Sequence, residues 1–317
     1  MSEAESETLY GREELDALVT DEDVFAGIFA CLERIWSPPE AIEDRNLAAS
    51  EYRTRLLERE LAEQYPSLYD ELAAKMGDHP VKTLESGSAI IMDALSLREG
   101  FQLVRDLSEE YDWQVTLSWA PVECLPTKTK FVCREWFDAP NPANVSLENF
   151  QYIGDMSIPA LPGTDLEYVW TRIPDKRLES AMTGNYSTEE LTDIYADVKA
   201  LLGEIIAEST HEEFLVSSDH GYVNHLGNNP YLPLADDIEA ALSGKFAGRN
   251  REIANGQAFE LLEDTGVIDH TNSQYVVKGH NAWTKRGATS RIMHGGFSLP
   301  ECMTPVLRID TTGELNS

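Results

Sequence analysis

The apolar and polar positions along the chain divide it into a helical part and a part in which strands alternate with helices. Up to about residue 84, apolar residues recur at helical spacing, first over 24–35, and a Ser-Pro-Pro sequence at 37–39 ends that run. Two further helices are predicted, a highly charged one over 40–64 and a shorter one over 66–76. Nothing in this part indicates catalysis, so we expect it to pack against the rest of the chain or to contact a partner.

From about residue 85, short apolar runs alternate with amphipathic segments. The predicted strands are 89–92, 114–119, 166–173, 214–217 and 306–309. A helix is predicted over 98–110, and another follows the capping box that starts at Ser187. Strands that alternate with helices indicate an α/β fold with a doubly wound, mainly parallel sheet flanked by helices. We therefore predict a helical N-terminal segment, 1–84, and an α/β domain, 85–317.

The chain is strongly acidic, with 56 Asp and Glu residues against 25 Lys and Arg and a formal charge of −31. The acids are scattered, which keeps a surface hydrated and is typical of a protein from a high-salt, halophilic cytoplasm. The four cysteines lack metal-binding spacing, which indicates reduced thiols. No apolar run approaches the ~18 residues of a membrane span, and the acidic N-terminus is unlike a secretory signal. We therefore expect a soluble, cytoplasmic protein with no membrane contact.

Two stretches of this acidic chain contain no carboxylate. One lies between Asp269 and Glu301, and the other runs from Cys124 to Arg134. In a chain of this charge they are the places where an anion would dock. Trp283, in the first stretch, would either stack on a base or belong to the core. The candidate substrate-binding residues of the two stretches are Lys128, Lys130, His280, Lys285 and Arg286.

Polar residues suited to chemistry follow four of the predicted strands. Asp93 follows the first, the sequence Pro126-Thr127-Lys128-Thr129 the second, Asp175 the third and Asp219-His220 the fourth. The carboxyl ends of parallel strands meet at one edge of a sheet, so these residues are expected near one another. A lone Asp after a strand is usually a helix cap or a turn residue. Several of them with an adjacent His indicate a metal site.

These segments resemble the alkaline phosphatase superfamily, and within it the PglZ domain, over about residues 85–310. The matching motifs, in chain order, are Ile91–Leu95, Leu125–Thr129, Ser217–Gly221 and His294–Glu301, which leads into Thr304-Pro305-Val306. The resemblance implies an alkaline phosphatase-like fold and a metal-dependent phosphoester hydrolase. In that superfamily two divalent cations flank a Ser or Thr nucleophile, which attacks phosphorus and becomes a transient covalent ester.

Carried over to this sequence, the resemblance implies a set of metal ligands. Asp93, Asp219 and His220 would hold one cation that also contacts the hydroxyl of the nucleophile, and His294 would bind the second. Taken alone, His294 reads equally well as a core or turn histidine. The glycines at 295 and 296 favour a ligand, because they mark a place where backbone approaches something closely.

The nucleophile implied by the resemblance is Thr129. It is preferred to Thr127 because it lies nearer the helix that residues 130–136 would start, where free N–H groups favour anions. The alternative is that both threonines belong to a hydrophilic turn with a helix cap. Ser96 is a weaker candidate for the same role.

The chain departs from the family pattern at the second cation. The superfamily supplies an Asp-x-x-x-His pair there, whereas this sequence has Asp175-Lys-Arg-Leu-Glu179. On a helix Asp175 and Glu179 would share a face, and an oxygen-richer site favours Mn²⁺ or Mg²⁺ over Zn²⁺. In the alternative interpretation, Asp175 caps a helix and Glu179 pairs with a basic neighbour. That leaves a single cation or an inactive site.

The function implied by the resemblance is phosphatase, phosphodiesterase or nuclease activity with one or two divalent cations. PglZ-type proteins are associated with bacteriophage resistance, so DNA or RNA is an expected substrate and other antiviral-defence proteins are expected partners. The alternative is a catalytically degenerate binding or assembly subunit of a defence complex. A mutase or transferase of the superfamily is disfavoured, because the stretch between Thr129 and Asp219 is too short for the cap domain such enzymes carry.

Overall fold

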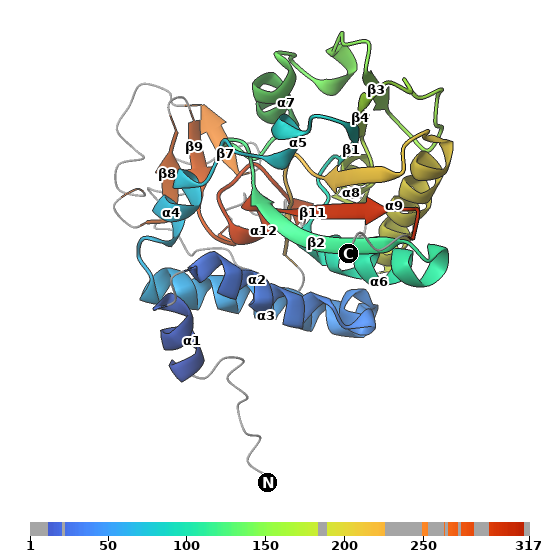
Figure 1. Ribbon diagram of the computed structural model, residues 1–317. Helices are drawn as coiled ribbons and strands as arrows, with labels where there is room; N and C mark the ends of the chain where they lie inside the picture. Colours follow the sequence, from blue (N-terminus) through green and yellow to red (C-terminus); the bar gives the residue numbers. More distant parts are fainter. Residues whose placement is uncertain are drawn as a thin grey trace.

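A six-stranded sheet lies at the centre of the computed structural model, with helices on both of its faces (Figure 1). The strand order is β2-β11-β5-β1-β4-β3. The structure describes residues 12–20, 23–182, 189–225, 249–252, 263, 266–271, 274–281 and 292–313. The six strands are β1 (Gly87–Met92), β2 (Gln114–Pro121), β3 (Phe150–Ile153), β4 (Leu166–Thr171), β5 (Glu213–Ser217) and β11 (Met303–Asp310).

All neighbouring strands are parallel except β11, which runs antiparallel to β5 and to β2. The sheet is therefore mostly parallel and doubly wound, which confirms the predicted fold class. Strand β1 lies in the middle of the parallel part, and five of its six residues are buried. A nearly continuous apolar run is typical of such a strand, because helices cover both of its faces.

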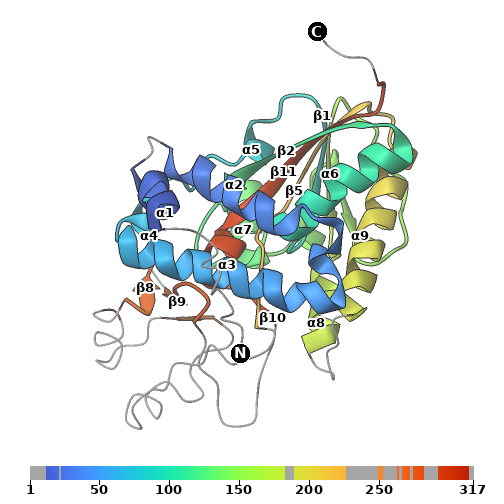
Figure 2. The same ribbon diagram turned by 90° about the horizontal axis from the view of Figure 1, so that it is seen from below.

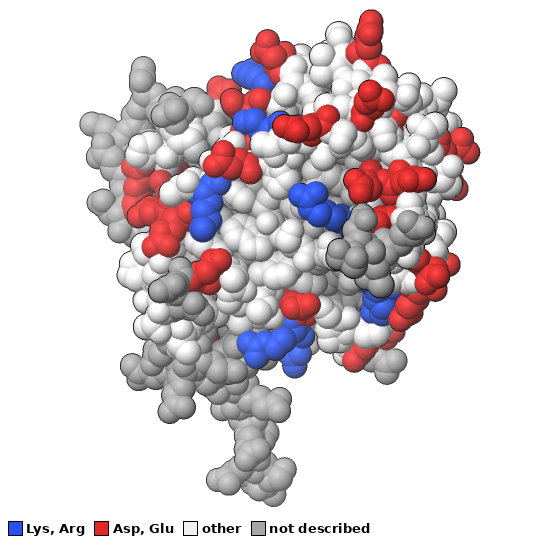
Figure 3. Space-filling view, viewed as in Figure 1, with Lys and Arg blue, Asp and Glu red and all other residues white. Residues whose placement is uncertain are grey.

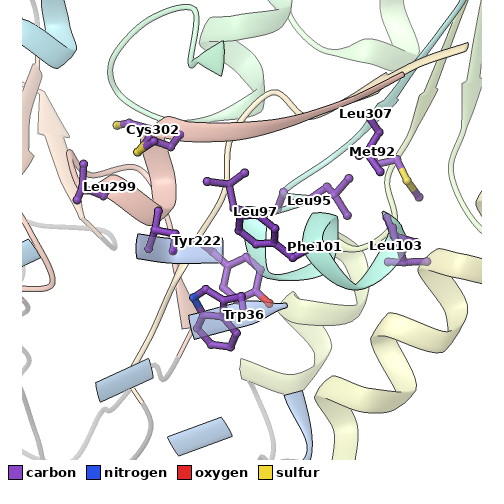
Figure 4. Close-up of a cluster of buried hydrophobic side chains, with 14 of the residues drawn as sticks. Trp36, Met92, Leu95, Leu97, Phe101, Leu103, Tyr222, Leu299, Cys302 and Leu307 are labelled. Atoms are coloured by element: carbon purple, nitrogen blue, oxygen red, sulfur yellow. The ribbon is translucent and has the colours of Figure 1, made fainter. Parts of the chain in front are cut away.

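The two faces of the sheet are covered by different helices. Helices α6 and α9 pack on one face, where Ile90 and Met92 of β1 join their core (Figure 4). Helices α5 and α7 cover the other face, where Ile91 joins a second cluster. The helices that follow β1 in the chain are α6 (Leu97–Tyr111), α7 (Thr129–Phe137), α8 (Asp175–Met182), α9 (Glu189–Glu208) and α12 (Leu299–Cys302), with the short 3-10 helix η2 (Pro142–Asn144).

The N-terminal helices pack outside α6 and share its core (Figure 2). They are α1 (Arg12–Val19), α2 (Val24–Trp36), the 3-10 helix η1 (Pro39–Ile42), α3 (Asp44–Gln64) and α4 (Leu68–Ala74). Helix α5 (Pro80–Thr83), which follows them, lies on the other face of the sheet. The predicted helix over 40–64 is thus divided into η1 and α3. None of the described helices combines the length and apolar character needed to cross a membrane.

Two smaller sheets contribute loops beside the main sheet. Strands β6 (Val223–Asn224) and β10 (Ile292–Met293) form one antiparallel pair. Strands β7 (Asn250–Glu252), β9 (Gln274–Val277) and β8 (Ile268–His270) form the other, in that order. These short strands have too few residues for a period-2 pattern to emerge, so the sequence did not predict them.

The acidic side chains are spread over the surface rather than collected into one tail. Figure 3 shows Asp and Glu side chains scattered over one face, with Lys and Arg interspersed among them.

The predicted capping box that starts at Ser187, just before α9, lies partly outside the described residues.

Candidate metal centre

Three predicted ligands meet at the carboxyl edge of the main sheet. One donor atom from each of Asp93, Asp219 and His220 lies within 4.8 Å of the others, and all three residues are buried. Asp93 follows β1, and Asp219 with His220 follows β5, which pairs with β1 in parallel. The parallel register brings these two strand ends together, as the sequence predicted.

The backbone just after Asp93 is shaped to hold Asp219. Ala94 has a left-handed φ of 64°, which is uncommon for a residue with a Cβ atom. Its N–H donates to Oδ1 of Asp219 at 3.2 Å. The other oxygen, Oδ2, has no hydrogen-bond partner among the described residues although Asp219 is fully buried. A buried carboxylate oxygen without a partner is what a bound cation would satisfy.

His220 directs a lone pair at the same space. Its Nδ1 lies 3.0 Å from the carbonyl oxygen of Gly221, so Nδ1 carries the proton and donates. Its Nε2 therefore has a free lone pair, 3.5 Å from Oδ2 of Asp219 and 3.8 Å from Oδ1 of Asp93. Burial lowers the pKa of His220 to about 4, which keeps the ring neutral. A neutral imidazole oriented by a backbone carbonyl is typical of metal-binding histidines.

The two aspartates are held close together away from water. Burial raises the pKa of Asp93 well above its usual range, and the charge of Asp219 raises it further. Burial also raises the pKa of Asp219 to about 6. Two facing carboxylates and an imidazole lone pair repel one another unless a positive charge lies between them. The donor set therefore fits a divalent cation.

Thr129 is the first residue of α7, and its hydroxyl reaches this cluster. Its Oγ1 donates to Oδ1 of Asp93 at 3.0 Å and lies 3.3 Å from Nε2 of His220. Because Nε2 of His220 carries no proton, a lone pair of this nitrogen faces a lone pair of Thr129 Oγ1. The hydroxyl oxygen thus joins the three predicted ligands around one small volume.

Thr127, the alternative candidate, has a different role. It is fully buried, and its hydroxyl donates to the carbonyl oxygen of Gly296 at 3.0 Å and accepts from the N–H of Gly295 at 2.9 Å. Both hydrogen-bonding functions are used, and they fasten the loop after β2 to the loop that carries His294. Ser96, the weaker candidate, is the N-cap of α6 and forms a capping box with Glu99.

His294 lies beside His220. The two rings are stacked, with centroids 4.4 Å apart and planes inclined by 9°. Nδ1 of His294 lies 3.2 Å from the carbonyl oxygen of Thr127, so this ring also has a free Nε2. That nitrogen lies 3.7 Å from Oδ1 of Asp175, the first residue of α8. Burial lowers the pKa of His294 to about 3 and raises that of Asp175 to about 7.

Glu179 does not join Asp175 in the cluster. Its half-exposed carboxylate forms an ion pair with Arg172 at 2.7 Å. This placement corrects the prediction that two carboxylates of α8 hold the second cation. It matches the alternative interpretation, in which Glu179 pairs with a basic neighbour. Asp175 and His294 are therefore the two described donors on this side of the cluster.

The predicted substrate-binding residues are divided between three environments. Lys128 is partly buried beside the loop of Gly295, and no hydrogen bond or ion pair of its ammonium is found in the part of the chain that the structure describes. Lys130 is exposed beside the ring of Phe131. His280 is buried, and its Nδ1 lies 2.7 Å from Oε2 of Glu58. His280 therefore contacts Glu58 in the interior instead of lining a phosphate path, which corrects the prediction for this residue.

The remaining two predicted cations, Lys285 and Arg286, lie outside the described residues, as does Trp283. Lys128 is thus the one predicted cation that the described structure places beside the cluster. Burial lowers the pKa of its ammonium, and the charge of Lys130 lowers it further. A partly buried ammonium without an acidic partner is suited to bind an anion.

Sequence reasoning missed the residues that hold the His294 loop. Glu301 accepts from the N–H of Gly296 at 2.8 Å and from the hydroxyl of Ser298 at 2.6 Å. Its carboxylate also binds Arg249 at 2.9 Å, and both side chains are fully buried. The capping-box pattern of the sequence at 298–301, Ser-Leu-Pro-Glu, is a local signal for the contact between Ser298 and Glu301. Nothing in the sequence paired Glu301 with Arg249.

Comparison with known proteins agrees with the resemblance that the motifs carry. The chain is 21% identical over 154 residues to the alkaline phosphatase-like protein PglZ of Bacillus cereus (strain H3081.97). The match covers 46% of this chain and 18% of that relative, so the chain spans less than a fifth of the relative's length. No family model matches the chain.

Two solved structures align with most of this chain at low identity and low TM-score. Phosphonoacetate hydrolase from Sinorhizobium meliloti 1021, in complex with phosphonoacetate, covers 70% of this chain and 89% of its own, with 10% identity and a TM-score of 0.38. Murine ectonucleotide pyrophosphatase/phosphodiesterase 5 covers 71% of this chain and 88% of its own, with 11% identity and a TM-score of 0.36.

Proposed function

We propose that this chain is a metal-dependent phosphoester hydrolase in which Thr129 is the nucleophile. The observation that carries the proposal is the position of Thr129 Oγ1, 3.0 Å from Oδ1 of Asp93 and 3.3 Å from the unprotonated Nε2 of His220. The similarity to a protein named alkaline phosphatase-like supports the same reaction class. Thr127 is not the nucleophile in this proposal, because its hydroxyl is occupied in holding Gly295 and Gly296.

Asp93, Asp219 and His220 would hold one divalent cation, Zn²⁺, Mn²⁺ or Mg²⁺. When bound, such a cation lowers the pKa of a neighbouring hydroxyl and offsets the negative charge of a phosphate. Hydrogen bonds within the protein orient the proposed ligands before a cation binds. The carbonyl oxygen of Gly221 fixes the tautomer of His220, and the N–H of Ala94 orients Asp219.

The chain's own residues also position the nucleophile and the phosphoryl group. Asp93 accepts the hydroxyl hydrogen of Thr129, so a lone pair of the same oxygen faces Nε2 of His220. Lys128, which precedes Thr129 and has no acidic partner among the described residues, supplies a positive charge for a phosphoryl oxygen. The first turn of α7 adds the favourable end of the helix dipole. These groups hold the phosphorus in reach of Thr129 Oγ1.

The Asp175–His294 pair provides two donors beside His220, so we propose that a second cation binds there more weakly than the first. A site completed by two protein donors has open positions, which a phosphate oxygen would fill. The class of ester that is cleaved is determined by comparing phosphomonoester, phosphodiester and nucleic-acid substrates. DNA and RNA remain candidate substrates, and defence proteins remain candidate partners.

The experiment that tests the function measures turnover of p-nitrophenyl phosphate, bis-p-nitrophenyl phosphate and single-stranded DNA, each with Mn²⁺, Mg²⁺ or Zn²⁺. Thr129→Ala is expected to lower kcat at least ~100-fold, whereas Thr129→Ser retains a hydroxyl and keeps measurable turnover. Melting curves confirm that both variants are folded. The proposal is wrong if no cation supports turnover, or if Thr129→Ala is as active as the natural protein.

A second candidate function is a binding or assembly subunit that has lost catalysis. The observation in its favour is the engagement of Glu179 by Arg172, which leaves the second cation with two donors. Metal analysis of purified protein separates the two candidates. Two bound cations per chain would exclude the subunit reading, and one cation without turnover would favour it.

A further inference from the structure

Helix α3 buries two carboxylates on the face that it turns toward the rest of the protein. Glu51 is 3% exposed and Glu58 is 1% exposed. They are seven residues apart, which places them on one face two turns apart. Burying a carboxylate is unfavourable unless its oxygens find partners. Glu58 bonds directly to the backbone of Leu299, next to the loop that carries His294, and Glu51 pairs with Arg98 of α6.

Glu58 reaches the loop that carries His294. Its Oε1 accepts from the N–H of Leu299 at 2.7 Å and from the hydroxyl of Tyr69 at 3.0 Å. The ring of Tyr69 packs edge-on against Phe297, with centroids 5.0 Å apart. The stretch from His294 to Leu299 is therefore held on its outer side by α3 and α4, and on its inner side by Thr127.

Glu51 reaches the loop that carries Asp219 and His220, through Arg98. Nη2 of Arg98 donates to Oε2 of Glu51 at 3.2 Å, and its Nε lies 3.2 Å from Oε1. The guanidinium lies 5.2 Å from the centroid of the Trp36 ring and 4.2 Å from that of the Tyr222 ring. Its Nη1 donates to the carbonyl oxygen of Tyr222, two residues after His220. The contact fixes the backbone where the ligand loop ends.

The two loops are also joined to each other. The N–H of Gly221 donates to the carbonyl oxygen of Glu301 at 3.0 Å. A Cβ atom at Gly221 would lie 2.0 Å from the carbonyl oxygen of Pro300, so the two backbones touch directly. A displacement of either loop is therefore passed to the other.

From these contacts we infer that Glu51 and Glu58 are positioning residues of the metal centre: α3 sets the places of His220 and His294 through Arg98 and the backbone of Leu299. The inference rests on the proposed metal centre. None of the described donors of the site belongs to the N-terminal segment. The inference gives that segment a role in positioning the donors. Buried polar contacts of this kind specify one docking geometry more than they add stability.

The test uses the full chain and two readouts. The first is hydrogen exchange, in metal-free protein, of the amides of Gly295 and Gly296, which are bonded to Thr127 and Glu301 rather than to Glu58. Glu58→Ala is expected to speed their exchange about tenfold or more. Glu58→Gln keeps an oxygen for Leu299 and is expected to restore slow exchange.

The second readout is the dissociation constant for Mn²⁺, measured by titration calorimetry. Removing partners that orient ligands weakens metal binding by roughly 10–100-fold, and this loss is expected for Glu58→Ala and for Glu51→Ala. Thr54→Val is the matched control for Glu58→Ala, because Thr54 is buried on the same helix but bonds to Trp36 and to the carbonyl oxygen of Ser50 rather than to the His294 loop. It should leave both readouts near those of the natural protein.

Glu58→Asp replaces Glu58→Ala if the latter does not fold. It retains the charge but withdraws the oxygen from Leu299, and the same two effects are expected. Unchanged exchange in the Glu58 variant, or an equal change in Thr54→Val, overturns the inference. If the natural protein binds no Mn²⁺, the proposed function fails, and the exchange measurement still decides whether α3 positions the loop.

Discussion

The hydroxyl of Thr127 joins the backbone of Gly296, donating to its carbonyl oxygen at 3.0 Å, although the two residues lie far apart in the chain. The same hydroxyl accepts from the neighbouring N–H of Gly295. The loop that leads to Thr129 and the loop that carries His294 are thereby one unit. Two threonines separated by a single residue consequently have separate tasks, and substitutions can tell them apart.

Thr127→Val is expected to lower the free energy of unfolding by about 1–3 kcal/mol, because it leaves a buried N–H without a partner. Thr129→Val, of the same size change, removes a hydroxyl that is not needed to close a loop, and should cost less than about 1 kcal/mol. Urea unfolding of both variants in chelator measures the difference. A larger loss for Thr129→Val would contradict the assignment.

Asp219→Asn should change stability in opposite directions with and without a cation. In chelator at pH 7.5 the variant avoids a buried carboxylate whose pKa burial raises to about 6, and it should be more stable by on the order of 1–3 kcal/mol. At a Mn²⁺ concentration about 1,000-fold above the dissociation constant, the natural protein gains about 4.1 kcal/mol that the variant forgoes. Thermal melts in the two conditions provide the test.

The advantage of Asp219→Asn in chelator should depend on pH with a definite sign. The folded pKa of Asp219 lies above the unfolded value of 3.8, so the folded state holds a proton between 3.8 and about 6 that the unfolded state has released. This group's contribution to stability is therefore present at low pH and lost as pH rises through that window. The gap between variant and natural protein should narrow from pH 7.5 to pH 5. A constant gap would mean that Asp219 is not perturbed.

Gly221→Ala should be poorly tolerated, because the added Cβ would lie 2.0 Å from the carbonyl oxygen of Pro300. Neither backbone can retreat without moving His220 or Glu301, so a loss of about 3 kcal/mol or more is expected. Gly154→Ala is the control, since its nearest neighbour would be 3.5 Å away. Denaturant midpoints of the two variants should differ clearly. Equal midpoints would show that the two loops are not in contact.

His79 offers a pH-dependent test away from the metal centre. Its Nδ1 accepts from the N–H of Val81, so Nε2 carries the proton between the hydroxyls of Ser217 and Thr304. Burial lowers the pKa of His79 to about 3, so its contribution to stability is lost as pH falls below the unfolded value of 6.5.

The substitution His79→Asn should therefore cost most above pH 7. The deficit should shrink by about 2 kcal/mol at pH 5, which corresponds to 1.5 pH units. Urea unfolding at pH 8 and pH 5 gives both values. A deficit that grows on acidification would mean that His79 is protonated in the folded protein.

The main strands and the residues that follow them could be predicted from sequence, because a buried parallel strand is a local apolar run. Asp93 and Asp219 were placed by that reasoning alone, since parallel register brings strand ends together. The partner chosen by a long side chain is not a local property. Glu179 and His280 have sequence neighbours that suit a site. In the folded structure, however, Glu179 contacts Arg172 and His280 contacts Glu58.

The direction of a strand was likewise beyond the sequence. An apolar run at 306–309 predicts a strand in either orientation, and β11 proved antiparallel. The different roles of Thr127 and Thr129 also depend on the loop that carries His294, which is distant in the chain. Proximity to the start of the predicted helix favoured Thr129, but the hydrogen bonds that occupy Thr127 are visible only in the folded structure.

Strand β11, which follows the other five strands of the main sheet in the sequence, lies between β5 and β2 rather than at an edge. While a ribosome is still producing the preceding residues, β5 and β2 have no partner on their facing sides, and each presents an open row of backbone donors and acceptors. The nascent chain therefore cannot close its sheet until residues 303–310 have emerged. A translation product truncated before this strand would keep these two strand edges open and would be exposed to aggregation.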